Sequence, residues 1–197
     1  MNFADDLVLE NQRARLRPLQ TTDHAALLAP AADPELWAFT LTRGDDPAAL
    51  ATYLNEAVQG RQAGLRYPFV IEDLATGRLA GSTSYYNVSA AERRLSIGYT
   101  WVGREFQRSG LNRAVKALLL GHAFDTLDYL RVELETDARN LKSQHAMRRM
   151  GATEEGTLRS HRFTQGGRRR DTVIFSLLPA EWAELRTTVF AEFTGRG

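Results

Sequence analysis

The chain has 197 residues, of which 43% are hydrophobic and 25% are charged. This composition is typical of a globular protein and excludes a largely disordered chain, and the length favours a single domain over residues 1–197. Because 25 Lys and Arg nearly balance 24 Asp and Glu, the overall charge indicates neither a nucleic acid nor an anionic membrane surface as a partner.

The absence of cysteine excludes disulfides, thiolate metal ligands and a cysteine nucleophile. The four histidines form no pair with metal-ligand spacing, so we expect no metal. The chain does not open with a basic segment followed by an apolar stretch, and no apolar window approaches the length of a membrane helix. We therefore expect a cytoplasmic protein.

The first half of the chain predicts a strand, two helices and a hairpin. Residues 13–18 alternate between polar and apolar side chains, as a strand does, and residues 22–23 are a helix start. A second helix is predicted over residues 46–62. Strands over residues 67–73 and 79–87 are joined by a turn and form the hairpin.

A further strand over residues 94–102 leads through a glycine-containing segment into a long helix, from Leu111 to about residue 127. The apolar residues of this helix form one stripe, which is typical of a crossover helix packed on a sheet. The stripe consists of Leu111, Ala114, Val115, Leu118, Leu119 and Ala123.

Residues 130–136 alternate as a strand, and Asn140 opens a short helix, of which Ala146, Met147 and Met150 are predicted to face inward. Two strands are expected near residues 155–164 and 172–178, and a C-terminal helix over about 180–193. Hairpins followed by a βαβ unit predict a mixed α/β sheet with a core over about residues 10–180.

The connection between the strand at 94–102 and the long helix is the segment that indicates chemistry. A strand that leads into a helix N-terminus presents free backbone N–H groups and the positive end of the helix dipole, which suit a phosphate. Gly110 allows close approach, and Arg104, Arg108 and Arg113 supply positive charge. The same features also fit an ordinary turn and a solvated helix start.

The segment lacks both the GxxxxGK[ST] and the GxGxxG patterns. It resembles the Q/R-x-x-G-x-G/A loop of the GNAT superfamily of N-acetyltransferases, which binds the acyl-CoA pyrophosphate, and Gln107 and Gly110 match it. Asn112 departs from the last position and is similar to the RimJ/RimL-type branch of ribosomal-protein N-terminal acetyltransferases. The resemblance covers about residues 10–180, with further matches at 97–101, 140–143, 150–152, 155–159 and 170–172.

This resemblance implies a GNAT fold, a central twisted mixed sheet of about seven strands flanked by helices. The strand at 94–102 and the strand after the long helix would diverge around the pantetheine of acetyl-CoA, whose acetyl group passes directly to a primary amine. The residues implied to bind acetyl-CoA are Trp101, Val102, Gln107, Arg108, Ser109, Gly110, Leu111, Asn112, Arg113, Asn140 and Ser143.

The implied roles of these residues differ. Backbone amides at 100–102 would polarise the thioester carbonyl, and those of 108–113 would hold the pyrophosphate. Asn140 would bond the pantetheine, and Ser143 is the candidate general acid for the CoA thiolate. The residues alone also fit Asn140 as an N-cap and Ser143 as a polar residue of the first turn.

The general base is less conventional. Relatives often carry Glu immediately before the Ile-Gly-Tyr segment, where this chain has Ser96, so Glu135 and His161 are the substitutes. Either could instead be an ordinary polar residue of its strand. Because an α-amine with a pKa of about 7.8 is roughly 14% neutral at pH 7 and a lysine amine only about 0.04%, a weak base favours an α-amine acceptor.

The acceptor is therefore expected to be a protein or peptide N-terminus, with a small-molecule amine or a non-catalytic acyl-CoA-binding module as alternatives. Trp37 and Phe39 either border the acceptor site or pack in the core. The run at 168–170 is either a solvated hairpin tip or favours acidic acceptors. The amphipathic segment 182–193 either covers the core or pairs with a second subunit as a homodimer.

Overall fold

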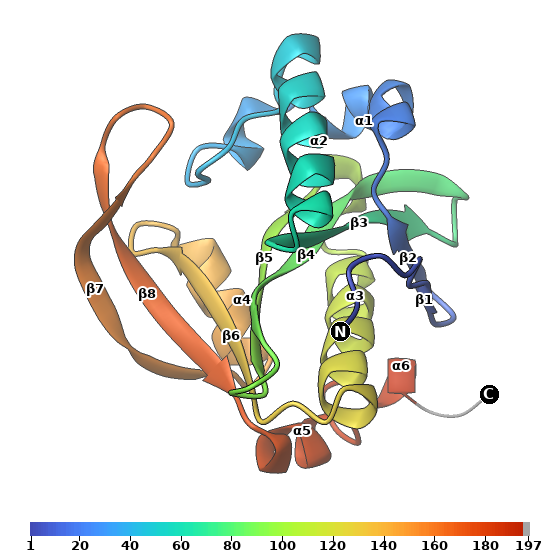
Figure 1. Ribbon diagram of the computed structural model, residues 1–197, viewed down its shortest axis with the longest axis vertical. Helices are drawn as coiled ribbons and strands as arrows, with labels where there is room; N and C mark the ends of the chain where they lie inside the picture. Colours follow the sequence, from blue (N-terminus) through green and yellow to red (C-terminus); the bar gives the residue numbers. More distant parts are fainter. Residues whose placement is uncertain (195–197) are drawn as a thin grey trace.

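The structure is a computed structural model and describes residues 1–194. Among these residues, eight strands form one sheet in the order β1-β2-β3-β4-β5-β6-β8-β7 (Figure 1). The strands are β1 Leu9–Glu10, β2 Ala14–Pro18, β3 Arg66–Asp73, β4 Arg78–Ser89, β5 Arg94–Val102, β6 Arg131–Asp137, β7 Thr153–Phe163 and β8 Arg169–Leu177. All neighbours are antiparallel except the parallel pair β5 and β6, so the predicted mixed α/β sheet is confirmed.

The helices connect the strands as expected for this topology. They are α1 His24–Ala31, α2 Pro47–Gln62, α3 Leu111–Gly121, α4 Leu141–Arg149, α5 Pro179–Leu185 and α6 Ala191–Thr194. Short 3-10 turns lie at Thr21–Asp23, Pro34–Leu36 and Arg104–Phe106, and a π-helical turn at His122–Thr126 extends α3. None of the helices among residues 1–194 has the length and apolarity needed to cross a bilayer.

The helices cover the sheet in two layers (Figure 1). Helices α1 and α2 lie on one face, where Leu27, Leu50 and Leu54 form a core with Val70 of β3. Helices α3, α4 and α5 lie on the other face and close the larger core. Trp182 of α5 is buried there, so the C-terminal segment covers the core of its own chain.

The sheet has one strand beyond the expected seven or so, the two-residue β1, which is too short to show alternation in sequence. Two other details of the prediction are wrong. Ala146 is exposed, and the side chain that α4 buries is Gln144. The helix expected over 180–193 is two short helices, because the hydroxyls of Thr187 and Thr188 donate to the Glu184 carbonyl and compete with the helical ladder.

Strands β5 and β6 separate after a short paired segment. They pair only from Arg94 opposite Arg131 to Ser96 opposite Glu133, and beyond these residues each strand continues without the other. The predicted divergence of these two strands is thus present. It opens at the ends of β5 and β6 from which the chain enters α3 and α4.

A bulge in β5 lies at this divergence. The register with β4 jumps from Gly98 opposite Ser84 to Trp101 opposite Ser82, so β5 carries one extra residue there. Tyr99 takes a positive φ of 50° to accommodate it. A bulge of this kind turns backbone groups out of the ladder and leaves them free for a ligand.

Candidate active site

The connection from β5 to α3 is held in one conformation by its own side chains. Gly110 has a φ of 85°, in the left-handed region that glycine adopts without strain. The Ser109 hydroxyl donates to a main-chain carbonyl of the preceding turn at 2.6 Å. The helical ladder starts with the bond from the Ala114 amide to the Gly110 carbonyl, so the amides of Asn112 and Arg113 precede it and face an approaching anion.

The three arginines near this loop are not equivalent. Arg104 forms an ion pair with Asp33 at 2.7 Å, and Arg113 is paired with Glu192 of α6. Arg108 is exposed and forms no ion pair with any residue in 1–194. Because the Arg113 pair is about half exposed, it is weak enough to exchange for a phosphate.

The N-terminus of α4 lies beside this loop. Asn140 is the N-cap of α4, and its side-chain oxygen accepts from the Ser143 amide at 3.0 Å. The Ser143 hydroxyl is half-buried and has no hydrogen-bond partner in residues 1–194. Lys142 donates to the Gln107 side chain at 2.6 Å, which joins the starts of α3 and α4 across the end of the divergence.

Asn140 has a capping role that can be separated from any contact with a ligand. We expect Asn140→Ala to lower the free energy of unfolding by about 1 kcal/mol, because the first turn of α4 loses its cap. Asn140→Ser keeps a capping oxygen and should remain close to wild type in a urea melt. If Asn140→Ser also binds acetyl-CoA as tightly as wild type in calorimetry, the side chain is a cap alone.

On the α3 side of the bulge lies a small buried polar network. The Lys116 ammonium donates to the Thr100 hydroxyl at 3.1 Å, and that hydroxyl lies 2.7 Å from the hydroxyl of Thr83. Only 5% of Lys116 is exposed, and burial lowers the pKa of its amine to about 7. The network holds the bulged strand against α3.

The side chains of several predicted site residues are buried in the two cores. The Trp101 side chain packs in the α1–α2 core, and Val102 and Leu111 are buried in the core on the other face. Of the two alternatives left open for Trp37, the structure favours core packing: Trp37 is 5% exposed and packs against Trp101 and Tyr53. Its apolar ring area is too large to leave outside the core.

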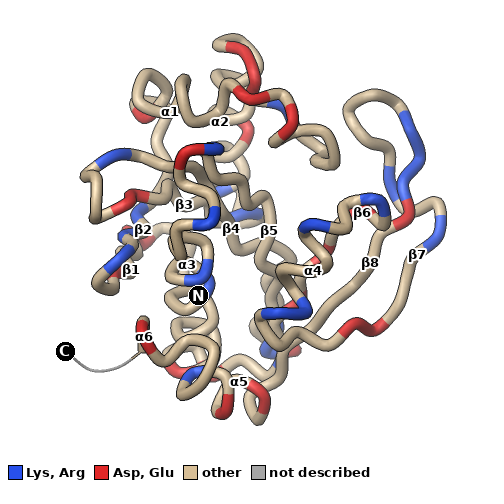
Figure 2. The backbone as a smooth tube through the Cα atoms, turned by 180° about the vertical axis from the view of Figure 1, so that it is seen from behind, with Lys and Arg blue, Asp and Glu red and all other residues tan. Residues whose placement is uncertain are grey.

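Phe39, the other predicted acceptor contact, lies where the connection after α1 meets the β7–β8 hairpin. Its carbonyl accepts from Arg170 at 3.3 Å, and nearby the Leu41 carbonyl accepts from Gln165 at the hairpin tip. The hairpin carries the basic run at 168–170 (Figure 2). Only its last member, Arg170, is buried, so the run is not uniformly a solvated tip.

Glu135 is the carboxylate at the divergence. It lies on β6 beyond the last residue paired with β5, and Arg162 and Arg170 each approach it at 3.6 Å. Burial raises the pKa of the Tyr86 hydroxyl well above its ordinary value, and the charge of Glu135 adds to the effect. Ser96, which replaces the usual acid, is buried near Tyr86 and supplies no carboxylate.

His161, the second candidate base, lies farther from the divergence. Its strand β7 is separated from β6 by β8. It lies in an irregular segment between Leu158 and Arg162, and its Nδ1 is buried without a partner among residues 1–194. Of the two candidate bases, Glu135 is thus the one on a strand that borders the divergence.

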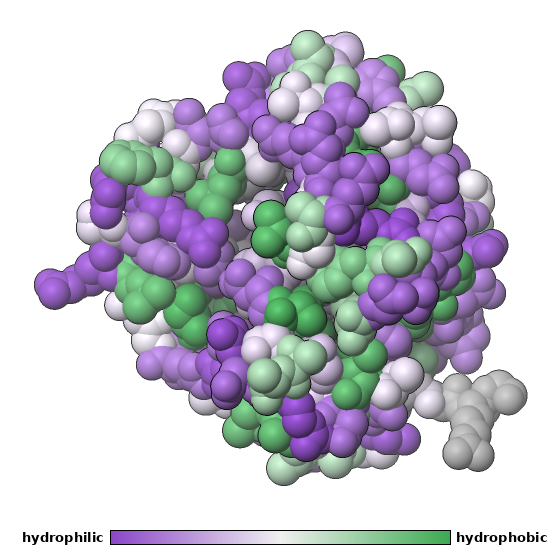
Figure 3. All heavy atoms as spheres, viewed as in Figure 1, coloured by the Kyte–Doolittle hydropathy of each residue, from purple (hydrophilic) through white to green (hydrophobic). Residues whose placement is uncertain are grey.

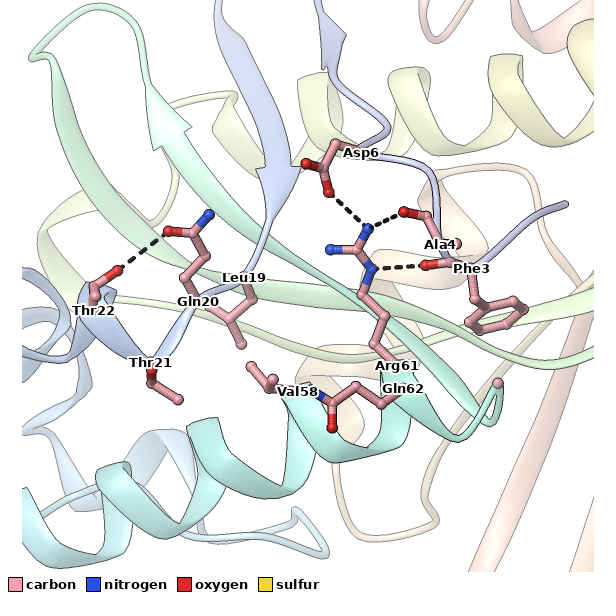
Figure 4. A pocket seen from close by; sticks show the side chains of 11 residues that line it. Phe3, Ala4, Asp6, Leu19, Gln20, Thr21, Thr22, Val58, Arg61 and Gln62 are labelled. Carbon is pink, nitrogen blue, oxygen red and sulfur yellow. Dashed lines mark hydrogen bonds and ion pairs between the residues drawn. The ribbon is translucent and has the colours of Figure 1, made fainter.

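A hollow of about 720 Å³ lies away from this site, between the N-terminal segment and the C-terminal half of α2 (Figure 4). Arg61 crosses it to donate to the Phe3 carbonyl at 2.9 Å. None of its lining residues belongs to β5, β6, α3 or α4, so it is not connected with the divergence.

Comparison with known proteins identifies the family. The model of the acetyltransferase (GNAT) domain matches residues 13–153. The chain belongs to the GNAT acetyltransferase family. The resemblance found from the sequence motifs is thereby confirmed.

Three relatives show how far the likeness of this GNAT chain extends. The Bacillus subtilis (strain 168) protein YdaF, provisionally called a ribosomal N-acetyltransferase, is 34% identical over 64% of this chain and 63% of its own length. The chain thus matches somewhat less than two thirds of that relative. A structure from T. thermophilus, provisionally called an acetyltransferase, is 31% identical, with a TM-score of 0.86 over 95% of this chain and 97% of its own. Mycobacterium smegmatis RimJ, solved with CoA-disulfide, shares the fold at 22% identity, with a TM-score of 0.77 over 95% and 96%.

Two residues of this GNAT chain that bear on the site were not found from sequence. Lys116 is one of only two lysines in a chain rich in arginine, and it interrupts a largely apolar helix, which is a usable signal. Arg66 begins a strand and gives no comparable signal, because its burial depends on α2 above it. In residues 1–194 no group of three or more His, Asp or Glu is placed to hold a metal ion.

Proposed function

We propose that this chain transfers the acetyl group of acetyl-CoA to the α-amine at a protein or peptide N-terminus. The observation that carries the proposal is the divergence of β5 and β6, with the starts of α3 and α4 joined at its end through Gln107 and Lys142. Figure 3 shows a hollow on this face of the molecule, between the β7–β8 hairpin and the part that contains α2. A cofactor with a long thin arm and an anionic end fits such an opening.

The loop at the start of α3 suits the diphosphate of acetyl-CoA. A left-handed glycine, two backbone amides outside the helical ladder and the exposed Arg108 give donors without a bulky side chain at Gly110. Mycobacterium smegmatis RimJ, which shares the fold, holds a CoA derivative. The name of YdaF points to a ribosomal acceptor, which supports a protein N-terminus.

Acetyl-CoA supplies the thioester, and the residues of this chain would position it and move protons. Backbone amides at the β5 bulge polarise the carbonyl. Glu135 takes the proton that the attacking amine loses and passes it to water, and the Ser143 hydroxyl gives a proton to the departing CoA sulfur and regains one from water. Arg162 and Arg170 each approach the Glu135 carboxylate at 3.6 Å and hold it in place, and an acceptor amine that is already partly neutral at pH 7 needs the least help from a base.

The choice of amine is directly testable. With two peptides that contain one lysine each, one with a free and one with a blocked N-terminus, we expect acetylation on the free α-amine and little on the lysine side chain. The expected reason is the difference in neutral fraction at pH 7, about 14% against about 0.04%. Mass spectrometry locates the added acetyl group, and preferential acetylation of the blocked peptide would contradict the proposed acceptor.

A further inference from the structure

Arg66 is a buried guanidinium without a carboxylate partner. Its exposed fraction is 8%, and its polar contacts are with hydroxyls: Nε donates to Ser84 Oγ at 2.8 Å and Nη2 to the Tyr53 hydroxyl at 2.7 Å. The guanidinium also lies 3.9 Å from the ring centroid of Tyr99. No carboxylate of residues 1–194 lies within ion-pair distance of it.

This arrangement leaves the charge of Arg66 incompletely compensated. Removing a guanidinium from water is costly unless an anion or a full set of acceptors replaces the water. Two hydroxyls and the rings of Tyr53 and Tyr99 replace part of that water, while Nη1 makes no hydrogen bond with residues 1–194 and is not among the nitrogens sealed from solvent. The group is therefore held rigidly with one donor edge open.

Arg66 lies on the α1–α2 face of the sheet, beside the bulge of β5. Tyr99, which stacks on Arg66, is the bulge residue of β5, and its ring meets the ring of Tyr86 at 5.4 Å. Tyr86 lies opposite Arg66 on one side and opposite Ser96 on the other, and Ser96 lies opposite Glu133, two residues before Glu135 on β6. Arg66, the two tyrosines and Glu135 therefore line the same face of the sheet around the start of the divergence.

Positive charge exceeds negative charge along this lining. Arg162 and Arg170 share the single carboxylate of Glu135, and Arg66 adds a third guanidinium. The neighbouring Asp137 does not change the balance, because it is paired with Arg168. An acceptor that carries a negative group beside its amine would balance this excess positive charge.

We propose that Arg66 binds a carboxylate of the acceptor, while the acceptor amine lies at Glu135. This inference rests on the proposed acetyl transfer and narrows its substrate class to amines that carry a carboxylate nearby. The carboxylate could belong to an Asp or Glu at a peptide N-terminus or to the α-carboxylate of a free amino acid. A charge-assisted hydrogen bond to a rigid guanidinium is the chemistry that both share.

Matched acid and amide acceptors test the proposal in the wild-type protein. One arm compares C-terminally amidated peptides that begin with Glu or Gln, and the other compares free glutamine with its α-amide. We expect the acid to exceed its amide by about 10- to 100-fold in kcat/KM in one arm, and that arm identifies the source of the carboxylate. Equal rates for acid and amide in both arms would overturn the inference and leave acetyl transfer standing.

Variants test whether Arg66 causes the preference for acid over amide acceptors. Arg66→Met should remove the preference by slowing the acid acceptor alone, and Arg66→Lys should retain part of it. Arg159→Met, which removes an exposed arginine of β7, should keep the full preference. An equal loss for acid and amide in both Arg66 variants would show a structural role only and overturn the inference. If the wild-type protein acetylates none of the four acceptors, acetyl transfer itself is contradicted, and this inference with it.

Discussion

Glu135→Gln is expected to lower the kcat of acetyl transfer by about 100-fold or more, because the amine loses the group that accepts its proton. The amide keeps the shape of the carboxylate and can still accept from Arg162 or Arg170, which now approach at 3.6 Å. Steady-state rates at saturating acetyl-CoA give kcat. Calorimetry with acetyl-CoA should give wild-type affinity, since Glu135 lies outside the connection from β5 to α3 that is proposed to bind the diphosphate.

The matched control is Glu133→Gln. Glu133 lies two residues earlier on β6, on the same face, but inside the segment paired with β5, and it accepts from Arg131 at 2.8 Å. Loss of this carboxylate should change kcat by less than about threefold, a modest effect for a group outside the reacting centre. A Glu135→Gln protein with near wild-type kcat, or the same loss in both variants, would exclude Glu135 as the base.

Lys116 is expected to make the free energy of unfolding rise with pH above neutrality. Burial lowers the pKa of its amine to about 7, whereas in the unfolded chain the amine has its ordinary pKa near 10.5. Between these values the unfolded chain binds more protons than the folded protein, so stability grows by roughly 1 kcal/mol per pH unit. Below pH 7 the amine is protonated in both the folded and the unfolded state, so Lys116 no longer makes the free energy of unfolding depend on pH.

Lys116→Met should remove that rise and should be more stable than wild type at pH 7 and below, because no charge remains to be buried. Lys142→Met is the matched control, since Lys142 is the other lysine of the chain and is exposed. Urea melts of the three proteins at pH 6, 7, 8 and 9 measure the slopes. A Lys116→Met protein that keeps the wild-type slope would contradict a neutral buried amine.

The buried polar network of Lys116, Thr100 and Thr83 bears on activity as well as on stability. Lys116 acts on Thr100, which lies in the bulged part of β5 whose amides are proposed to polarise the thioester carbonyl. The aligned hydroxyls of Thr83 and Thr100 fix that strand against α3. The bulge is therefore supported from one face by this network and from the other by Tyr99 stacked on Arg66.

Local patterns were sufficient to predict most of the fold. Helix α2 begins and ends where predicted, because Asp46 caps it with a bond to the Ala49 amide at 2.8 Å and Pro47 fixes its first turn. The long helix ends as an α-helix at Gly121 and continues as a π turn, a change that its apolar stripe does not reveal. Strand β1 is too short to show any periodicity.

The same distinction between local and long-range contacts decides which parts of the site could be predicted. The left-handed turn before α3 and the cap of α4 were predictable because both depend on backbone geometry near Gly110 and Asn140. The surroundings of Arg66, Lys116 and Trp37 depend on contacts between segments distant in sequence, which no local pattern contains. For this reason the sequence left open whether Trp37 borders the acceptor site or packs in the core.

Release of the CoA thiol is the most direct measure of acetyl transfer from acetyl-CoA to an α-amine. The protein contains no cysteine, so a thiol reagent reports CoA without a background signal from the enzyme. With acetyl-CoA and peptides that have free N-termini, we expect thiol release that depends on the peptide and matches the acetylated α-amine found by mass spectrometry. Binding of acetyl-CoA in calorimetry without any acceptor-dependent release would contradict the proposed acetyl transfer and indicate a module that holds acyl-CoA without turnover.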